Sequence, residues 1–266
     1  MRVLTQGDDY GFTRAVTDGI VDSIDRGVLR NTGLFANMPS AEYAVSFMKD
    51  RADVCFGIDF NIVAGKPVSD PKDVAHLVDE NGWFIKSGTA LRNPLFATEE
   101  GRRQLYPYEE VYRELRAQFD RFVEMTGGKK PGYLHAHSLQ HEHYNEAIRQ
   151  ISREEGIPFS MEFLETLGFK TVFPVSGASN SKQFNALDQL NKNSIALVME
   201  DLSKLEGEEN IMIIAHPGYI DADLLGMTSL SLERCKDAEM FQSSELKAWL
   251  DAHDAELVTY TDLYQE

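Results

Sequence analysis

Five residues that could bind a metal ion or move protons come at the ends of predicted strands, far apart along the chain. They are Asp8, Asp9, Asp59, His137 and His216. Aspartate is common in turns and helix caps, so each position taken alone has a structural explanation. In parallel α/β folds, however, the carboxyl ends of the strands converge to build one active site. The joint placement of these residue types therefore predicts a site at that edge.

Carboxylate and imidazole donors without cysteine partners suit a single divalent cation. Such a mixed oxygen and nitrogen set fits Zn, Mg, Mn or Co and does not choose among them. The segment "HAHSLQHEHYN" adds further histidines. Because residues i and i+2 of a strand face the same side, His135 and His137 can both point into the site. The roles of His135 and His141 stay open. The two cysteines lack metal-ligand spacing and predict neither a zinc site nor a disulfide framework.

The composition limits the class of partner. The chain has 266 residues and a formal net charge of −17, so long-range repulsion argues against nucleic acid or an anionic membrane surface. Small molecules such as sugars fit better. No Pro/Gly/Ser-rich linker divides the sequence, which predicts one domain over residues 1–266. There is no signal-like apolar core and no stretch of the ~20 apolar residues that span a bilayer, so we expect a cytoplasmic protein. The oligomeric state is open, a homo-oligomer included.

Strand and helix patterns alternate along the chain, which is typical of parallel α/β folds. We expect strands at 2–6, 31–37, 53–62, 132–137, 211–216 and 256–262. Amphipathic helices are expected at 13–27, 42–50, 108–128, 144–155, 194–207 and 243–254. In the first helix, Thr13 is the expected N-cap and Gly27 lies just past the end. The pattern does not assign residues 159–193.

Four separated motifs span nearly the whole chain. They read "GDDYGFTRAVTDGIVDSIDRGVLRNTGLFANMPSAEYAV", "FGIDFNIVAGKPV", "KKPGYLHAHSLQH" and "AHPGYIDADLL". In order and spacing they resemble the motifs of the YdjC-like carbohydrate deacetylases, whose first known member type removes acetyl groups from chito-oligosaccharides. The resemblance implies an α/β fold, an irregular TIM-like β/α barrel of the glycoside hydrolase/deacetylase type, with one divalent metal ion.

The resemblance also implies a role for most of the residues at the strand ends. The first aspartate of the pair, Asp8, is the implied general base, and the second, Asp9, is an implied metal ligand. His137, six residues after Pro131, is implied as another ligand. His216, in the late "HPG" motif, is the implied general acid.

This chain departs from the family pattern at several positions. Asp59 stands where the family's "GxH" strand end carries a metal-binding histidine, and we expect Asp59 to serve as a ligand in its place. An Asp/Asp/His site is harder and more anionic than an Asp/His/His site, which favours Mg and Mn. Tyr133 and His135 stand where the histidine-rich motif has His and then Asp, and Leu139 replaces a further motif histidine.

Hydrolysis of an N-acetyl amide suits these residue types. A divalent ion polarises the carbonyl and acidifies water, a carboxylate takes the remaining proton, and a histidine protonates the leaving amine. We therefore expect a metal-dependent hydrolase that removes N-acetyl groups from small carbohydrates, either chito-oligosaccharides or amino sugars, phosphorylated or not. Two alternatives stay open. One is an amidohydrolase-type metal hydrolase, which also places an "HxH" at a strand end, and the other is a non-catalytic sugar-binding relative.

Overall fold

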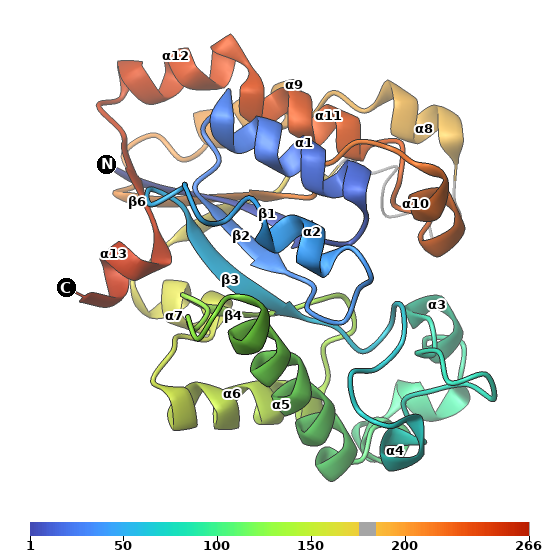
Figure 1. Ribbon diagram of the computed structural model, residues 1–266. Helices are drawn as coiled ribbons and strands as arrows, with labels where there is room; N and C mark the ends of the chain where they lie inside the picture. Colours follow the sequence, from blue (N-terminus) through green and yellow to red (C-terminus); the bar gives the residue numbers. More distant parts are fainter. Residues whose placement is uncertain (176–184, 266) are drawn as a thin grey trace.

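The computed structural model describes residues 1–175 and 185–265, which are built around one parallel β-sheet (Figure 1). In the described residues the sheet has seven strands. They are β1 (Arg2–Tyr10), β2 (Asn31–Leu34), β3 (Cys55–Phe60), β4 (Leu134–Ala136), β5 (Lys170–Val172), β6 (Asn210–Ala215) and β7 (Glu256–Val258).

β1 lies at the centre of this sheet. The strand order is β4-β3-β2-β1-β6-β5, and β7 pairs with the first residues of β1. Every pairing between these strands is parallel, so their carboxyl ends lie at one edge. The sheet curls into a half-barrel with helices around it, which confirms the predicted irregular β/α barrel.

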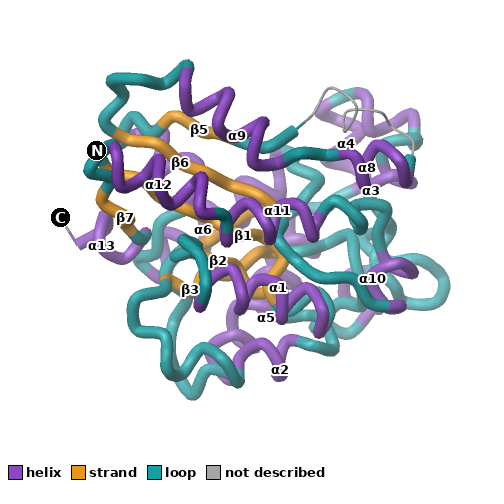
Figure 2. Tube along the Cα trace, turned by 90° about the horizontal axis from the view of Figure 1, so that it is seen from above, coloured by secondary structure: helices purple, strands orange, loops and turns teal. Residues whose placement is uncertain are grey.

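Helices lie around the curled sheet, some over its faces and some beside it. They are α1 (Arg14–Asp25), α2 (Ala41–Val45), α3 (Ser87–Ala90), α4 (Glu99–Leu105), α5 (Tyr108–Met125), α6 (Glu142–Glu155), α7 (Ser160–Thr166), α8 (Ala186–Asn191), α9 (Ser194–Ser203), α10 (Ala222–Met227), α11 (Arg234–Gln242), α12 (Ser244–Ala252) and α13 (Tyr260–Gln265). In Figure 1, α1, α9, α11 and α12 lie on one side of the sheet and α5 and α6 on the other. Figure 2, seen from above, shows α1, α11 and α12 lying over β1 and β6.

α1 shows how the sequence specifies a helix and its packing. The Thr13 side chain accepts a hydrogen bond from the backbone N–H of Val16, which confirms the predicted N-cap. Val16 and Ile20 are fully buried, as their helical spacing predicts. A Cβ at Gly19 would lie 2.6 Å from the backbone of Gly218, so only glycine lets α1 approach the turn after β6 this closely.

The long connection between β3 and α5 forms a separate wall beside the sheet. It contains α3, α4 and two short 3-10 helices, Pro71–Val74 and Pro94–Ala97. Glu114 on α5 anchors this connection, because its carboxylate accepts the backbone N–H groups of Val68 and Ser69 at 2.9 and 3.0 Å. Burial raises the pKa of Glu114 above its ordinary value, although these donors oppose the shift.

The strand boundaries differ from the prediction at two places that matter for function. β1 runs on to Tyr10, so Asp8 and Asp9 lie on the strand and do not follow it. Its pairing with β2 shifts register between Gly7 and Tyr10, because Asp9 has a left-handed φ of 73° that interrupts the ladder. The last strand ends at Val258, and the residues predicted to extend it begin α13. Among the described residues, no helix combines the length and apolar character needed to cross a membrane.

Candidate active site

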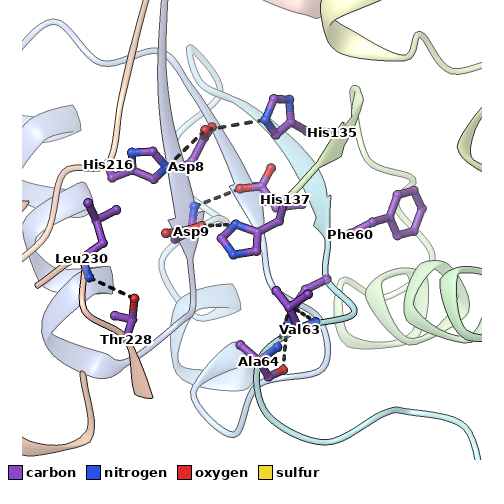
Figure 3. A network of polar contacts seen from close by, with 12 residues as sticks. Asp8, Asp9, Phe60, Val63, Ala64, His135, His137, His216, Thr228 and Leu230 are labelled. Carbon is purple, nitrogen blue, oxygen red and sulfur yellow. Dashed lines mark hydrogen bonds and ion pairs between the residues drawn. The ribbon is translucent and has the colours of Figure 1, made fainter. Parts of the chain in front are cut away.

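The candidate catalytic residues meet at the carboxyl-end edge of the sheet, as their strand-end positions predict (Figure 3). Asp8 and Asp9 lie at the end of β1, and Asp59 is the fifth residue of β3. His137 follows β4 by one residue, and His216 follows β6 by one residue.

Asp8 lies between two histidines at the floor of a cavity (Figure 3). Its Oδ2 atom is 3.6 Å from Nε2 of His135 and 4.0 Å from Nε2 of His216. Its Oδ1 atom accepts a hydrogen bond from the Gln6 side chain at 2.7 Å. Burial raises the pKa of the Asp8 carboxyl to about 7, and the hydrogen bond from Gln6 opposes that shift. A carboxyl with this pKa can both take and give a proton near neutral pH.

Asp9 has a close nitrogen partner at each carboxylate oxygen. Oδ1 lies 2.9 Å from Nδ1 of His137, and Oδ2 accepts from Nη2 of Arg234 at 2.5 Å. Burial alone would raise the pKa of Asp9, but His137 and Arg234 outweigh it and hold that pKa well below its usual range. The left-handed backbone at Asp9 is rare for a residue other than glycine and is typical of functional sites. Asp9 is therefore a fixed, ionised carboxylate.

Asp59 on β3 is completely buried, and its carboxylate reaches across β2 to the backbone of β1. Its Oδ2 atom accepts the backbone N–H of Asp9 at 2.9 Å, whereas Oδ1 is buried without a hydrogen-bond partner. A Cβ at Gly33 of β2 would lie only 1.7 Å from that Oδ1 atom, so glycine makes room for the carboxylate. Burial, together with the nearby charge of Asp8, raises the pKa of Asp59 well above its ordinary value.

The histidines differ in their surroundings. His135 is the register partner of Asp59 on the neighbouring strand, and its Nδ1 atom lies 2.7 Å from the Ser160 hydroxyl, which leaves Nε2 directed at Asp8. Burial lowers the pKa of His135 to about 4 and that of His216 to about 3, so both rings are neutral at neutral pH. His137 packs edge-on against the Phe35 ring.

These donors could hold a divalent cation in two ways. The ligand atoms of Asp8, Asp59 and His135 all lie within 4.8 Å of one another. Among the predicted ligands Asp9, Asp59 and His137, Asp9 contacts both of the others, because its backbone N–H donates to Asp59 and its Oδ1 atom lies 2.9 Å from Nδ1 of His137. Asp59, whose buried Oδ1 atom has no hydrogen-bond partner, belongs to both sets.

The sequence leaves the role of one functional candidate, His135, open and gives no indication of a second, Arg234. The i, i+2 spacing of His135 and His137 predicts that both can face the site, but it does not say what His135 does there. No sequence pattern indicated a role for Arg234, because it is 225 residues from Asp9 along the chain. Its guanidinium is fully buried, stacks over the Phe12 ring and leaves Nη1 without a hydrogen-bond partner.

A cavity of about 740 Å³ opens above these residues. Its floor carries Asp8, His135, His137, His216 and Arg234, and its walls are formed by residues 86–92 and 225–231. Lys86 and Arg92 bring positive charge to one wall. A second cavity of about 720 Å³ lies between α2, α5 and the start of β3 and contains none of these candidate residues. We therefore place the site in the first cavity.

Histidine 141 has a structural role. Its Nδ1 atom accepts the backbone N–H of Tyr144 at 3.3 Å and so caps α6, and its ring stacks on Tyr106 at 4.3 Å. Burial lowers the pKa of His141 to about 4, which keeps Nδ1 free to accept that hydrogen bond. His141 therefore belongs to the scaffold.

Comparison with known proteins agrees with this fold. The chain is 32% identical over 99% of its length, and 99% of the relative's, to carbohydrate deacetylase 2 of Listeria innocua serovar 6a. It is 25% identical to a carbohydrate deacetylase of Clostridium beijerinckii over 99% of this chain and all of that protein.

Solved structures show the same fold at lower identity. A proposed cellobiose-phosphate cleavage protein from Enterococcus faecalis V583 superposes with a TM-score of 0.77 at 21% identity, covering 98% of both chains. A family 4 carbohydrate esterase from Streptomyces lividans, solved with acetate, superposes with a TM-score of 0.52 at 10% identity, covering 97% of this chain and 92% of that one. The sequence model of the YdjC-like protein family matches residues 2–252, and the chain belongs to that family.

Proposed function

We propose that this protein is a divalent-metal-dependent hydrolase that removes N-acetyl groups from small carbohydrates, such as chito-oligosaccharides or amino sugars. The observation that carries the proposal is the arrangement of Asp8 in the cavity floor, between His135 and His216 and next to the buried carboxylate of Asp59. The names of the relatives, which are carbohydrate deacetylases, support the same reaction.

The buried carboxylates fit a cation. Asp59 carries an oxygen with no hydrogen-bond partner, and burial near Asp8 disfavours its ionised form. A divalent ion would offset this cost, because it supplies positive charge where like charges are held together. The donor set of carboxylates and imidazole suits Mg, Mn, Zn or Co.

We propose that Asp9, Asp59 and His137 hold the ion. This assignment leaves Asp8, the aspartate that faces the cavity, free to accept a proton. The left-handed backbone of Asp9 supports this assignment. Adjacent residues of a regular strand point to opposite faces of the sheet, and this backbone conformation takes Asp8 and Asp9 out of that alternation. When bound, the ion polarises the amide carbonyl and lowers the pKa of water.

Asp8, Asp59 and His135 form the alternative ligand set, which the proximity of their ligand atoms favours. The contact between His135 Nδ1 and Ser160 is also of the kind that orients histidine ligands. Metal content separates the two sets. Asp9→Asn and His137→Gln should lose stoichiometric metal under our assignment, whereas Asp8→Asn and His135→Gln should lose it under the alternative.

Asp8 and His216 then move the protons of the reaction. Asp8 takes a proton from the attacking water, for which its pKa of about 7 is well matched. His216 is neutral, so it can donate to the leaving amine only after it has received a proton. Asp8 Oδ2 lies 4.0 Å from Nε2 of His216, too far for a direct hydrogen bond, so it would supply that proton through one bridging water. The proton thus passes from water through Asp8 and His216 to the amine.

The cavity supports a small, polar substrate. A volume of about 740 Å³ is in the range of sites for small molecules. Lys86 and Arg92 in its wall would favour a sugar that carries a phosphate group. An amidohydrolase-type enzyme would instead turn over carbamoyl or lactone substrates, and a sugar-binding relative would turn over nothing.

A substrate screen tests the proposal. The purified protein, reloaded with Mg, Mn, Zn or Co, is incubated with N-acetylglucosamine, short chito-oligosaccharides and their phosphate esters, and released acetate is measured. We expect acetate from at least one of these substrates and none with Asp8→Asn. Carbamoyl or lactone turnover without acetate release would support the amidohydrolase alternative.

A further inference from the structure

A cluster of buried charges lies behind His216, outside the cavity. It consists of Lys192, just before α9, and of Glu233 and Asp237 at the start of α11 and within it. Lys192 Nζ lies 2.8 Å from Asp237 Oδ1 and 3.1 Å from Glu233 Oε2, and the exposed fraction of each side chain is 5% or less. Buried ion pairs cost desolvation and rarely add net stability compared with apolar residues of similar volume. Stability alone therefore does not account for this cluster.

Asp237 connects the cluster to the active site. Its Oδ1 atom accepts hydrogen bonds from the Ser194 hydroxyl at 2.6 Å and from Lys192, and its Oδ2 atom accepts the backbone N–H of His216 at 3.2 Å. Two donors on Oδ1 fix the plane of the carboxylate. The position from which Oδ2 accepts the backbone N–H of His216 is therefore fixed as well.

His216 needs such an acceptor because the strand ends there. The last register pair between β1 and β6 joins Gly7 and Ala215, so His216 is the first residue beyond the ladder. The next residue, Pro217, has no N–H with which to hold the turn. Gly218 again bonds to α11, through its N–H and the Arg234 carbonyl at 3.2 Å. The turn that carries His216 is thus held by α11.

We propose that the Lys192–Asp237 pair positions His216 for proton transfer, with Asp237 taking the place of a neighbouring strand at the end of β6. The proposal rests on the role given to His216 in the proposed function. Asp237 touches the backbone of His216 and not the cavity, so it is a positioning residue. The same helix fixes Asp9 through Arg234, so α11 sets the distance between two parts of the site that come from different strands.

Lys192→Met tests the positioning role. Methionine matches the length of lysine without its charge, so it fills the same space while Asp237 loses the cation that fixes it, at a cost in stability that urea unfolding measures. Because a misplacement of about 1 Å can cost about 100-fold in rate, we expect kcat to fall by up to about 100-fold. KM and metal content should change little, since no contact to substrate or metal is removed. Asp237→Asn should act in the same way.

The matched control is Glu114→Gln. Glu114 is also a fully buried carboxylate that accepts backbone N–H groups, but it lies on α5. Unfolding by urea verifies that all three variants fold and shows how much each is destabilised. A drop in kcat that merely followed lost stability would appear in Glu114→Gln too.

A second readout does not depend on activity. The chain has seven histidines, so protein labelled with ¹⁵N-histidine gives seven backbone amide signals, and His216→Gln identifies that of His216. We expect this signal to shift, and its hydrogen exchange to accelerate, in Lys192→Met and Asp237→Asn but not in Glu114→Gln.

Unchanged kcat together with an unchanged His216 signal in both variants would overturn the positioning role. If the wild-type protein releases no acetate, the proposed function fails, and the amide signal still reports whether the pair holds His216.

Discussion

Substituting Gly33 with alanine should remove function through Asp59, a residue on the neighbouring strand. The new Cβ would lie 1.7 Å from Asp59 Oδ1 and 2.3 Å from its Cγ, where contacts under 3.0 Å essentially do not occur. The carboxylate must therefore move by about 1 Å or more, a displacement that can cost about 100-fold in rate. Overpacking should also lower the free energy of unfolding by about 1–3 kcal/mol.

The assay compares Gly33→Ala with Gly132→Ala. A Cβ at Gly132 would overlap Cys55 Sγ at 2.3 Å, so this variant is similarly overpacked but does not touch the site. Urea unfolding should show comparable destabilisation. Calorimetric metal titration and acetate release should show weaker binding and about 100-fold lower kcat only in Gly33→Ala. Wild-type metal affinity and kcat in a folded Gly33→Ala protein would refute the assignment of Asp59 as a ligand.

Three further predictions concern other residues of the site and scaffold. His216→Ala should abolish acetate release while atomic absorption finds metal content unchanged, since His216 is no proposed ligand; retained turnover would remove it from proton transfer. Arg234→Met should raise the pKa of Asp9, because the adjacent guanidinium is removed, and should weaken metal binding below neutral pH; calorimetric titrations that match wild type from pH 5 to 8 would contradict this. His141→Asn keeps a helix cap but cannot titrate. Burial holds the pKa of His141 at about 4 in the folded protein, below its ordinary 6.5, so the unfolded chain binds a proton at this residue first as the pH falls. Between pH 6.5 and 4 the free energy of unfolding of wild type should therefore fall by up to about 3 kcal/mol relative to that of His141→Asn, as measured by urea unfolding. The same pH dependence of stability in both proteins would contradict this prediction.

Local patterns predicted the elements that surround the site. The Thr13 cap and the buried face of α1 follow from spacing alone, because N-caps and helical periodicity act over a few residues. The parallel arrangement also followed from alternation of strands and helices, and with it the convergence of Asp8, Asp59 and His216 at one edge.

Interactions over long sequence distances could not be predicted in this way. Arg234 pairs with Asp9, and Asp237 with His216, only because α11 packs beside the ends of β1 and β6. The left-handed backbone conformation of Asp9 could not be predicted either, since aspartate adopts it only where tertiary contacts hold it there. These contacts decide which donors face a cation, so the sequence indicated the group of residues but not their division into ligands and proton carriers.

The central claim is that a divalent cation at Asp59 supports removal of N-acetyl groups from small sugars. The most direct test measures acetate release from N-acetyl chito-oligosaccharides by one preparation before chelation, after chelation, and after one divalent ion per chain has been restored. Our account predicts that chelation abolishes acetate release and that the restored ion recovers it in wild type but not in Asp59→Asn. Undiminished acetate release by the fully chelated protein would contradict it.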